Sequence, residues 1–247
     1  MSIDTTLNYS PNFNIKKRKP NQIKFIIFHY TGMKNESEAI ERLTNIKSQV
    51  SCHYLIKNNG EIVAMVPDLY IAWHAGKSSW KNFKSLNKNS IGIEISNPGH
   101  NSSYKRFSNK QTQSIKKLSK YLIKKYKINQ KNILGHSDIA PTRKKDPGEK
   151  FPWKYLAKFG IGNWYFLSQK TLFNNRGKQT ILADKKKFYL NLSKIGYSIK
   201  SSTILTKDKY LNFIIVAFQR RFRQELINGK IDQECLLISQ NLTKKLS

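Results

Sequence analysis

The part of this 247-residue chain that decides its fold is Gly135-His136-Ser137-Asp138-Ile139-Ala140-Pro141-Thr142-Arg143-Lys144-Lys145-Asp146-Pro147-Gly148. It follows a short apolar run, Ile133-Leu134, which predicts the end of a β-strand. Two prolines, two glycines and the lack of a hydrophobic period predict a loop rather than a helix or strand. A histidine, a carboxylate and an ammonium within one loop are the parts of a hydrolytic metal site. The alternative is a solvated basic turn.

Upstream, a near-continuous apolar run from Ile23 to Tyr30 predicts a strand that is covered on both faces. His29 closes this run, and Thr31-Gly32 turns the chain. Ligands bind at the C-terminal edge of the strands in an open α/β sheet. His29 is therefore either a structural histidine or a residue of the functional site.

A second strand is predicted over residues 90–97, where Glu94 interrupts apolar neighbours. Because side chains alternate along a strand, Ile91, Ile93 and Ile95 share one face and Glu94 points to the other. A buried carboxylate is costly unless it has partners. Glu94 is thus either an edge-strand residue facing water or a functional carboxylate.

The remaining patterns up to residue 162 alternate between helix and strand. A helix is expected over residues 36–48, and an Asn58-Asn59-Gly60 turn between two apolar runs predicts a β-hairpin within 51–66. Ser108 and Gln111 have the spacing of a capping box, which predicts that a helix begins there. The predicted fold class is α/β, with a mixed β-sheet flanked by helices.

Gly160 to Asn163 marks a predicted boundary between a domain of residues 1–162 and a domain of residues 163–247. Beyond it, the residues that could ligate a metal become sparse. Residues 164–180 are expected to be irregular. Helices are then predicted over about 185–195, 209–224 and 232–246, giving a small C-terminal all-α domain of three helices.

Composition sets outer limits on function. The formal charge of +30 admits binding to an anionic polymer, but the excess of lysine and arginine is spread over the whole chain, so no specific nucleic-acid partner is expected. Cys52 and Cys235 are too few for a disulfide framework. No long apolar run or signal core is present, which predicts no transmembrane segment and a cytoplasmic protein. A periplasmic location by an unrecognised route is the alternative.

The quoted loop resembles the zinc-binding loop of the N-acetylmuramoyl-L-alanine amidases of the second amidase family, the AmpD- and AmiD-like enzymes. Other segments resemble the same family in the same order: the H-x-T context of His29, the S-x-H-Y segment at His53, the W-H-A-G segment at Trp73, and the I-G-I-E motif that ends at Glu94. The resemblance covers roughly residues 20–160.

The resemblance implies a zinc hydrolase with one Zn²⁺ per chain, held by His29, His136 and Asp146. It also implies that Glu94 is the catalytic base and that Lys144 stabilises the oxyanion. The residues expected to bind substrate are Trp73, His74, Ala75, His53 and Arg143. The substrate would be peptidoglycan or its muropeptide fragments, cut between N-acetylmuramic acid, in intact or 1,6-anhydro form, and L-alanine.

The C-terminal residues Phe218 to Arg223, with Gly229 to Asp232, resemble the F-Q-x-x-F…G-x-I-D signature of three-helix peptidoglycan-binding domains. Such a domain would either grip the wall polymer or stabilise the catalytic domain. Two competing functions remain at this stage: a non-catalytic peptidoglycan-recognition module, and a basic nucleic-acid-binding protein.

Overall fold

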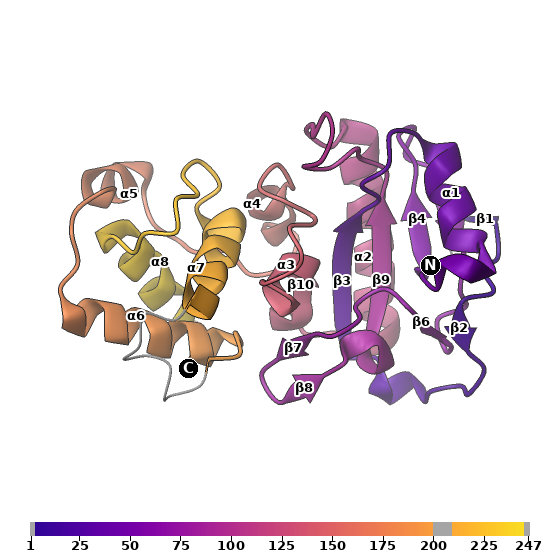
Figure 1. Cartoon of the computed structure of the whole chain (residues 1–247), viewed down its shortest axis with the longest axis horizontal. Helices are drawn as coiled ribbons and strands as arrows, with labels where there is room; N and C mark the ends of the chain where they lie inside the picture. The colour runs from indigo at the N-terminus through magenta and orange to yellow at the C-terminus, as the bar shows by residue number, and fades with distance from the viewer. Residues whose placement is uncertain (1–2, 200–208, 245–247) are drawn as a thin grey trace.

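The computed structural model describes residues 3–199 and 209–244 (Figure 1). Its strands are β1 (Thr6–Leu7), β2 (Phe13–Asn14), β3 (Phe25–Tyr30), β4 (Tyr54–Ile56), β5 (Ile62–Ala64), β6 (Ile71–Ala72), β7 (Ser79–Trp80), β8 (Phe83–Lys84), β9 (Ser90–Ile95) and β10 (Ile133–Gly135). Six of them form one sheet in the order β1-β5-β4-β9-β3-β10, and β2–β6 and β7–β8 form two small pairs. The sheet is mixed, because only β4 and β5 pair antiparallel within it.

The α-helices are α1 (Glu36–Thr44), α2 (Asn109–Tyr126), α3 (His136–Ile139), α4 (Trp153–Ala157), α5 (Gln169–Asn175), α6 (Leu182–Ile195), α7 (Lys209–Phe222) and α8 (Gln233–Lys244). Single 3₁₀ turns lie at η1 (Pro20–Gln22), η2 (Ile46–Ser48), η3 (Leu86–Asn89) and η4 (Gln130–Asn132). The α/β class predicted from the sequence is confirmed, and so is the hairpin, which is formed by β4 and β5.

The two central strands, β3 and β9, bring the site together. They pair in parallel, and the register sets His29 directly opposite Glu94. Partners across a pleated pair share one face of the sheet, so these two side chains project together from the C-terminal ends of their strands. Glu94 does not lie on an edge strand, because β9 is paired with β4 on its other side. The possibility of a water-facing edge glutamate is therefore wrong.

Helix α2 supports the sheet from behind in the view of Figure 1. It begins at the predicted capping box: Ser108 Oγ accepts from the Gln111 backbone N–H at 3.1 Å, and Gln111 Oε1 accepts from the Ser108 N–H at 3.0 Å. Its apolar stripe of Ile115, Leu118 and Leu122 is fully buried. This packing covers one face of the sheet and buries the apolar side chains that the central strands place on that face.

The loop quoted at the outset contains one turn of helix, α3, that the sequence did not predict. The carboxylate of Asp138 accepts from the backbone N–H of Gly135 at 2.8 Å, which is the backward half of a capping box. Pro141 follows immediately and disfavours continuation of the helix. His136 therefore lies at the first position of a fixed turn rather than in an irregular loop.

The C-terminal helices pack against the sheet-containing half through α7, which lies beside α3 (Figure 1). The predicted helices correspond to α6, α7 and α8, whereas α5 lies in the segment expected to be irregular, where Ser168 caps it. One apolar cluster runs from the sheet through Trp153 to Phe188 and Phe218, so the core is continuous across the predicted boundary. Within the described ranges, no helix is long and apolar enough to cross a membrane.

Candidate metal centre and catalytic cleft

Three side chains from distant parts of the sequence converge at the C-terminal ends of β3 and β10. His29 Nδ1 lies 2.9 Å from His136 Nδ1, and each of these nitrogens lies 3.0 Å from the same oxygen, Asp146 Oδ2. All three residues are buried. They are the three ligands predicted from the sequence, and they form a potential metal-binding group within the described chain.

The hydrogen bond at His29 Nε2, the ring nitrogen that faces away from Asp146, determines the tautomer of His29. Ser90 Oγ donates to the Leu86 carbonyl at 2.7 Å, so it accepts from His74 Nε2 at 3.1 Å. His74 Nδ1 is then an acceptor for His29 Nε2–H at 3.0 Å. This chain leaves His29 Nδ1 without a proton, and its lone pair points at the Asp146 oxygen.

His136 is fixed in the same way. Its Nε2 donates to the carbonyl of Ala75 at 3.1 Å, which leaves Nδ1 as a lone pair. When both histidines are neutral, three acceptors therefore face one another at about 3 Å, an arrangement that a cation would stabilise. Tetrahedral ligands about 2.1 Å from a zinc ion lie roughly 3.4 Å apart, a few tenths of an ångström more than the separations here. The residues fit a small divalent cation.

The electrostatics of the group agree with this assignment. Burial lowers the pKa of His29 to about 4, and the charge of His136, when that ring is protonated, acts in the same direction. Burial alone would raise the pKa of Asp146, but the positive charge of the adjacent imidazoles when they are protonated, His136 foremost, holds it well below its usual range, and a bound cation would supply the same charge. A neutral His29 and an ionised Asp146 at neutral pH are the forms that bind a metal.

Glu94 lies next to this group on β9. Part of its side chain faces the cleft, but Oε2 is buried and accepts no hydrogen bond from residues 3–199 or 209–244. Burial raises the pKa of Glu94 well above its usual value, Asp146 adds to the rise, and the ammonium of Lys144 opposes it. A buried carboxylate without a partner is costly. A carboxyl group with a raised pKa is expected at a functional site where it must accept a proton during a reaction.

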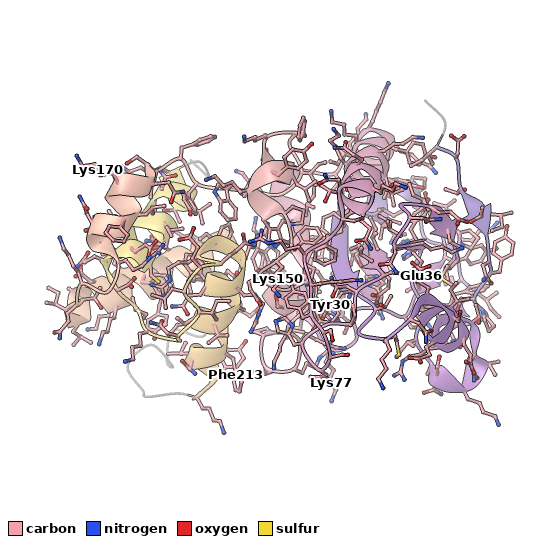
Figure 2. The ribbon with its side chains drawn as sticks, turned by 90° about the horizontal axis from the view of Figure 1, so that it is seen from above. Tyr30, Glu36, Lys77, Lys150, Lys170 and Phe213 are labelled. Carbon is pink, nitrogen blue, oxygen red and sulfur yellow. The ribbon has the colours of Figure 1, made fainter. Side chains whose placement is uncertain are left out.

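These residues open into a cleft of about 510 Å³. Its walls include Trp73, Arg143 and Lys144, together with Tyr30 and Arg42. Trp73 is held by a hydrogen bond from Nε1 to Asn14 Oδ1 at 2.5 Å. In Figure 2, Tyr30 lies near the middle of the molecule, between Lys170 at the far end of the C-terminal helices and Glu36 on α1.

Two residues predicted to bind substrate lie behind the cleft instead. His53 is fully buried, accepts from the Gly92 N–H at 3.0 Å and lies 2.9 Å from Arg18. The side chain of Ala75 is also fully buried, and its carbonyl accepts from His136 and Arg143. Neither side chain lines the cleft, which differs from the expectation that these two residues bind substrate. They support the residues that line the cleft.

The supporting role of His74 and Ser90 was missed from the sequence. His74 was predicted to contact substrate; it does line the cleft, and it also orients His29. Gly92 makes room for it, because a Cβ at that position would meet the His74 ring at 2.4 Å. The glycine in the I-G-I-E motif was the available signal, since a glycine inside a strand often marks a close approach.

Comparisons with known proteins agree with this geometry. The family model for N-acetylmuramoyl-L-alanine amidase (Amidase_2) matches residues 19–149. The Escherichia coli amidase AmiD is 35% identical over 236 residues, which cover 91% of this chain and 83% of that protein. The solved complex of E. coli AmiD with anhydro-N-acetylmuramic acid-L-Ala-D-γ-Glu-L-Lys superimposes with a TM-score of 0.78 at 34% identity, covering 91% of this chain and 90% of that one.

A further solved structure extends the likeness over the whole chain. AmpDh3 from Pseudomonas aeruginosa, in complex with an anhydromuramic pentapeptide, has a TM-score of 0.78 at 30% identity and covers 100% of this chain and 99% of its own. The family match includes His29, Glu94, His136, Lys144 and Asp146. From the match over more than half of its length and the similarity to these enzymes, this chain belongs to the N-acetylmuramoyl-L-alanine amidase family and is an amidase.

Proposed function

We propose that this enzyme is a zinc-dependent amidase that hydrolyses the bond between the lactyl group of N-acetylmuramic acid and L-alanine of the stem peptide. The observation that carries the proposal is the triangle of His29 Nδ1, His136 Nδ1 and Asp146 Oδ2 beside Glu94, whose buried Oε2 accepts no hydrogen bond from the described residues. Two imidazoles and one carboxylate are the donor set of a catalytic zinc site, and the open cleft gives substrate and water access to it.

The metal ligands, Glu94 and Lys144 have different roles in the proposed amide hydrolysis. The triangle would hold a zinc ion, which would supply a Lewis acid for the scissile carbonyl and would lower the pKa of the attacking water. Glu94 accepts the proton of the attacking water and passes it to the nitrogen of the leaving L-alanine as the C–N bond breaks. Lys144, whose ammonium lies near enough to affect the pKa of both His29 and Glu94, stabilises the oxyanion that develops on the carbonyl.

The substrate proposal rests on the cleft and on the relatives. Arg42, Arg143, Lys144 and Lys145 line the cleft and give it a cationic wall suited to the carboxylates of a stem peptide. Two of the similar structures hold 1,6-anhydro muropeptides. We therefore propose that soluble muropeptides, including the 1,6-anhydro form, are substrates and that the enzyme serves peptidoglycan recycling.

The test is product analysis. Purified enzyme should release the free stem peptide from an anhydro-N-acetylmuramyl tripeptide, with one new amine and one new carboxylate in the mass spectrum. Intact sacculi assayed in parallel would measure the preference between polymer and fragment. Failure to release the peptide from either substrate in the presence of zinc would contradict the proposed activity.

Two alternative functions were also predicted from the sequence, a recognition module and a nucleic-acid-binding protein. A non-catalytic recognition module is set aside, because the family is enzymatic and the chain has every candidate catalytic residue. Side chains that end in nitrogen project from around the outline of both halves (Figure 2), and lysine and arginine are spread along the whole sequence rather than gathered in one segment. The cellular compartment stays a prediction.

A further inference from the structure

Asp138 lies two residues after His136, on the buried side of α3 and outside the cleft. Its side chain is only 1% exposed, and three donors converge on its carboxylate. The first is the Gly135 backbone N–H at 2.8 Å, from the same turn. The second is the Tyr197 hydroxyl at 2.8 Å, and the third is Arg221 Nη1. Two of these three donors come from the C-terminal helical part of the chain.

Arg221 holds the same turn from its other end. On α7, its side chain is 4% exposed, and its Nη2 donates to the carbonyl of Ile133 at 3.0 Å. Its guanidinium also lies over the ring of Trp153, 4.2 Å from the ring centroid. One arginine thus connects α7 to β10 before His136 and to α3 after it. A planar guanidinium makes both contacts from two different nitrogens in one fixed geometry while it stacks on the ring, which a single ammonium nitrogen does not reproduce.

Tyr197 is itself fixed in place. It follows α6 and is 2% exposed, and its ring packs edge-on against Trp80 at 4.9 Å between centroids. A carboxylate buried with three donors resists movement, because any shift leaves a buried charge or donor unpaired. The turn that carries His136 is therefore held between the sheet and the C-terminal helices. Tyr197 and Arg221 both lie beyond residue 149, where the family match ends.

The position of the His136 side chain must be fixed closely for metal binding. Its Nδ1 must stay close to both His29 Nδ1 and Asp146 Oδ2 for the group to hold one cation. Some residues orient a metal ligand without touching the metal themselves. Replacing such a residue typically lowers metal affinity or activity by about 10- to 100-fold. Asp138 and its two partners occupy such a position for the backbone turn of His136.

We propose that Tyr197 and Arg221 are positioning residues of the amidase site, which act through Asp138 to hold the turn that bears His136. The C-terminal helices then form part of the catalytic unit, and their docking sets metal affinity and turnover. This inference rests on the proposed zinc site.

The experiment uses the full-length protein and the variants Tyr197→Phe, Arg221→Gln and Arg223→Gln. Arg223 is the matched control, because it is equally buried and forms an ion pair with Asp232 inside the C-terminal part. Three quantities are measured for each: the zinc dissociation constant by competition with a chromophoric chelator, kcat and KM on a soluble muropeptide, and the visible spectrum of the cobalt-substituted protein. Melting temperatures report the loss of stability.

We expect Arg221→Gln to weaken zinc binding at least tenfold, to lower kcat with KM within about twofold, and to alter the cobalt spectrum. Tyr197→Phe, which removes one hydroxyl and keeps the ion pair, should shift the same quantities in the same direction by about threefold. Arg223→Gln should lower the melting temperature and leave zinc affinity, kcat and the spectrum as in the wild type. In an Asp138→Ala background, which has no acceptor for the hydroxyl, Tyr197→Phe should have no further effect on zinc affinity.

The proposal is overturned if Tyr197→Phe binds zinc and turns over substrate as the wild type does, a result that can be read even if Arg221→Gln fails to fold. It is equally overturned if Arg223→Gln weakens zinc binding as much as Arg221→Gln, because general destabilisation would then explain the loss. A wild-type protein that binds no zinc would instead contradict the proposed function, so the two failures are distinguishable.

Discussion

Replacing Glu94 with glutamine is the perturbation that most sharply separates chemistry from structure. The two side chains have nearly the same shape, and Glu94 Oε2 accepts no hydrogen bond within the described chain, so the exchange breaks no described contact of that atom. It replaces a buried carboxyl group, whose pKa is raised by burial and by Asp146, with an uncharged amide. We therefore expect stability to stay level or rise, because the amide cannot ionise in this buried position.

Turnover should respond in the opposite direction. Without a proton acceptor beside the attacking water, kcat should fall about 100-fold or more, which corresponds to about 2.7 kcal/mol of lost transition-state stabilisation. Zinc content should remain near that of the wild type, because His29, His136 and Asp146 are untouched. Peptide release from a soluble muropeptide, zinc by elemental analysis and the melting temperature together make the assay. A Glu94→Gln enzyme with full zinc and a kcat within threefold of the wild type would refute the assignment.

Three further predictions concern the support of the site and of the fold. His74→Phe removes the acceptor of His29 Nε2–H and should weaken zinc binding about 10- to 100-fold, measured by chelator competition; unchanged affinity would contradict the tautomer assignment. Gly92→Ala should have a similar effect on zinc affinity by displacing His74, and a crystal structure of the variant would show whether that ring has moved. Asp68→Asn should lower the free energy of unfolding by about 1–3 kcal/mol at pH 7 in urea titrations. Burial opposes ionisation of Asp68, but its hydrogen bonds, that from Tyr126 foremost, hold its pKa below the usual value. Its contribution is therefore complete above about pH 4 and is lost as the pH falls further, so wild type and variant should converge in acid.

The sequence was sufficient for the elements whose signals are local. The apolar run ending at His29, the turn at Asn58-Asn59-Gly60 and the capping box at Ser108 each carry their own pattern, and each forms as predicted. The three candidate ligands also meet, because the carboxyl ends of adjacent parallel strands bring distant histidines to one edge of the sheet.

What the sequence did not reveal depends on contacts that have no local signal. The turn α3 forms because the Asp138 carboxylate reaches back to Gly135, and that carboxylate is held in turn by Tyr197 and Arg221, about 60 and 80 residues away. His53 and Ala75 lie in motifs next to the cleft, yet the pleat and the packing place both side chains behind it. Only the three-dimensional arrangement separates residues that touch the cleft from residues that support it.

The measurement that tests the central claim most directly is a zinc titration of the metal-free enzyme, followed by peptide release from an anhydro-muropeptide. Activity should be absent after chelation, rise linearly with added zinc and level off at about one equivalent per chain, as expected for one site of three protein ligands. His136→Ala should show no such rise. Full activity in the chelated enzyme, or a wild-type response from His136→Ala, would contradict the assignment of His29, His136 and Asp146 as the metal centre.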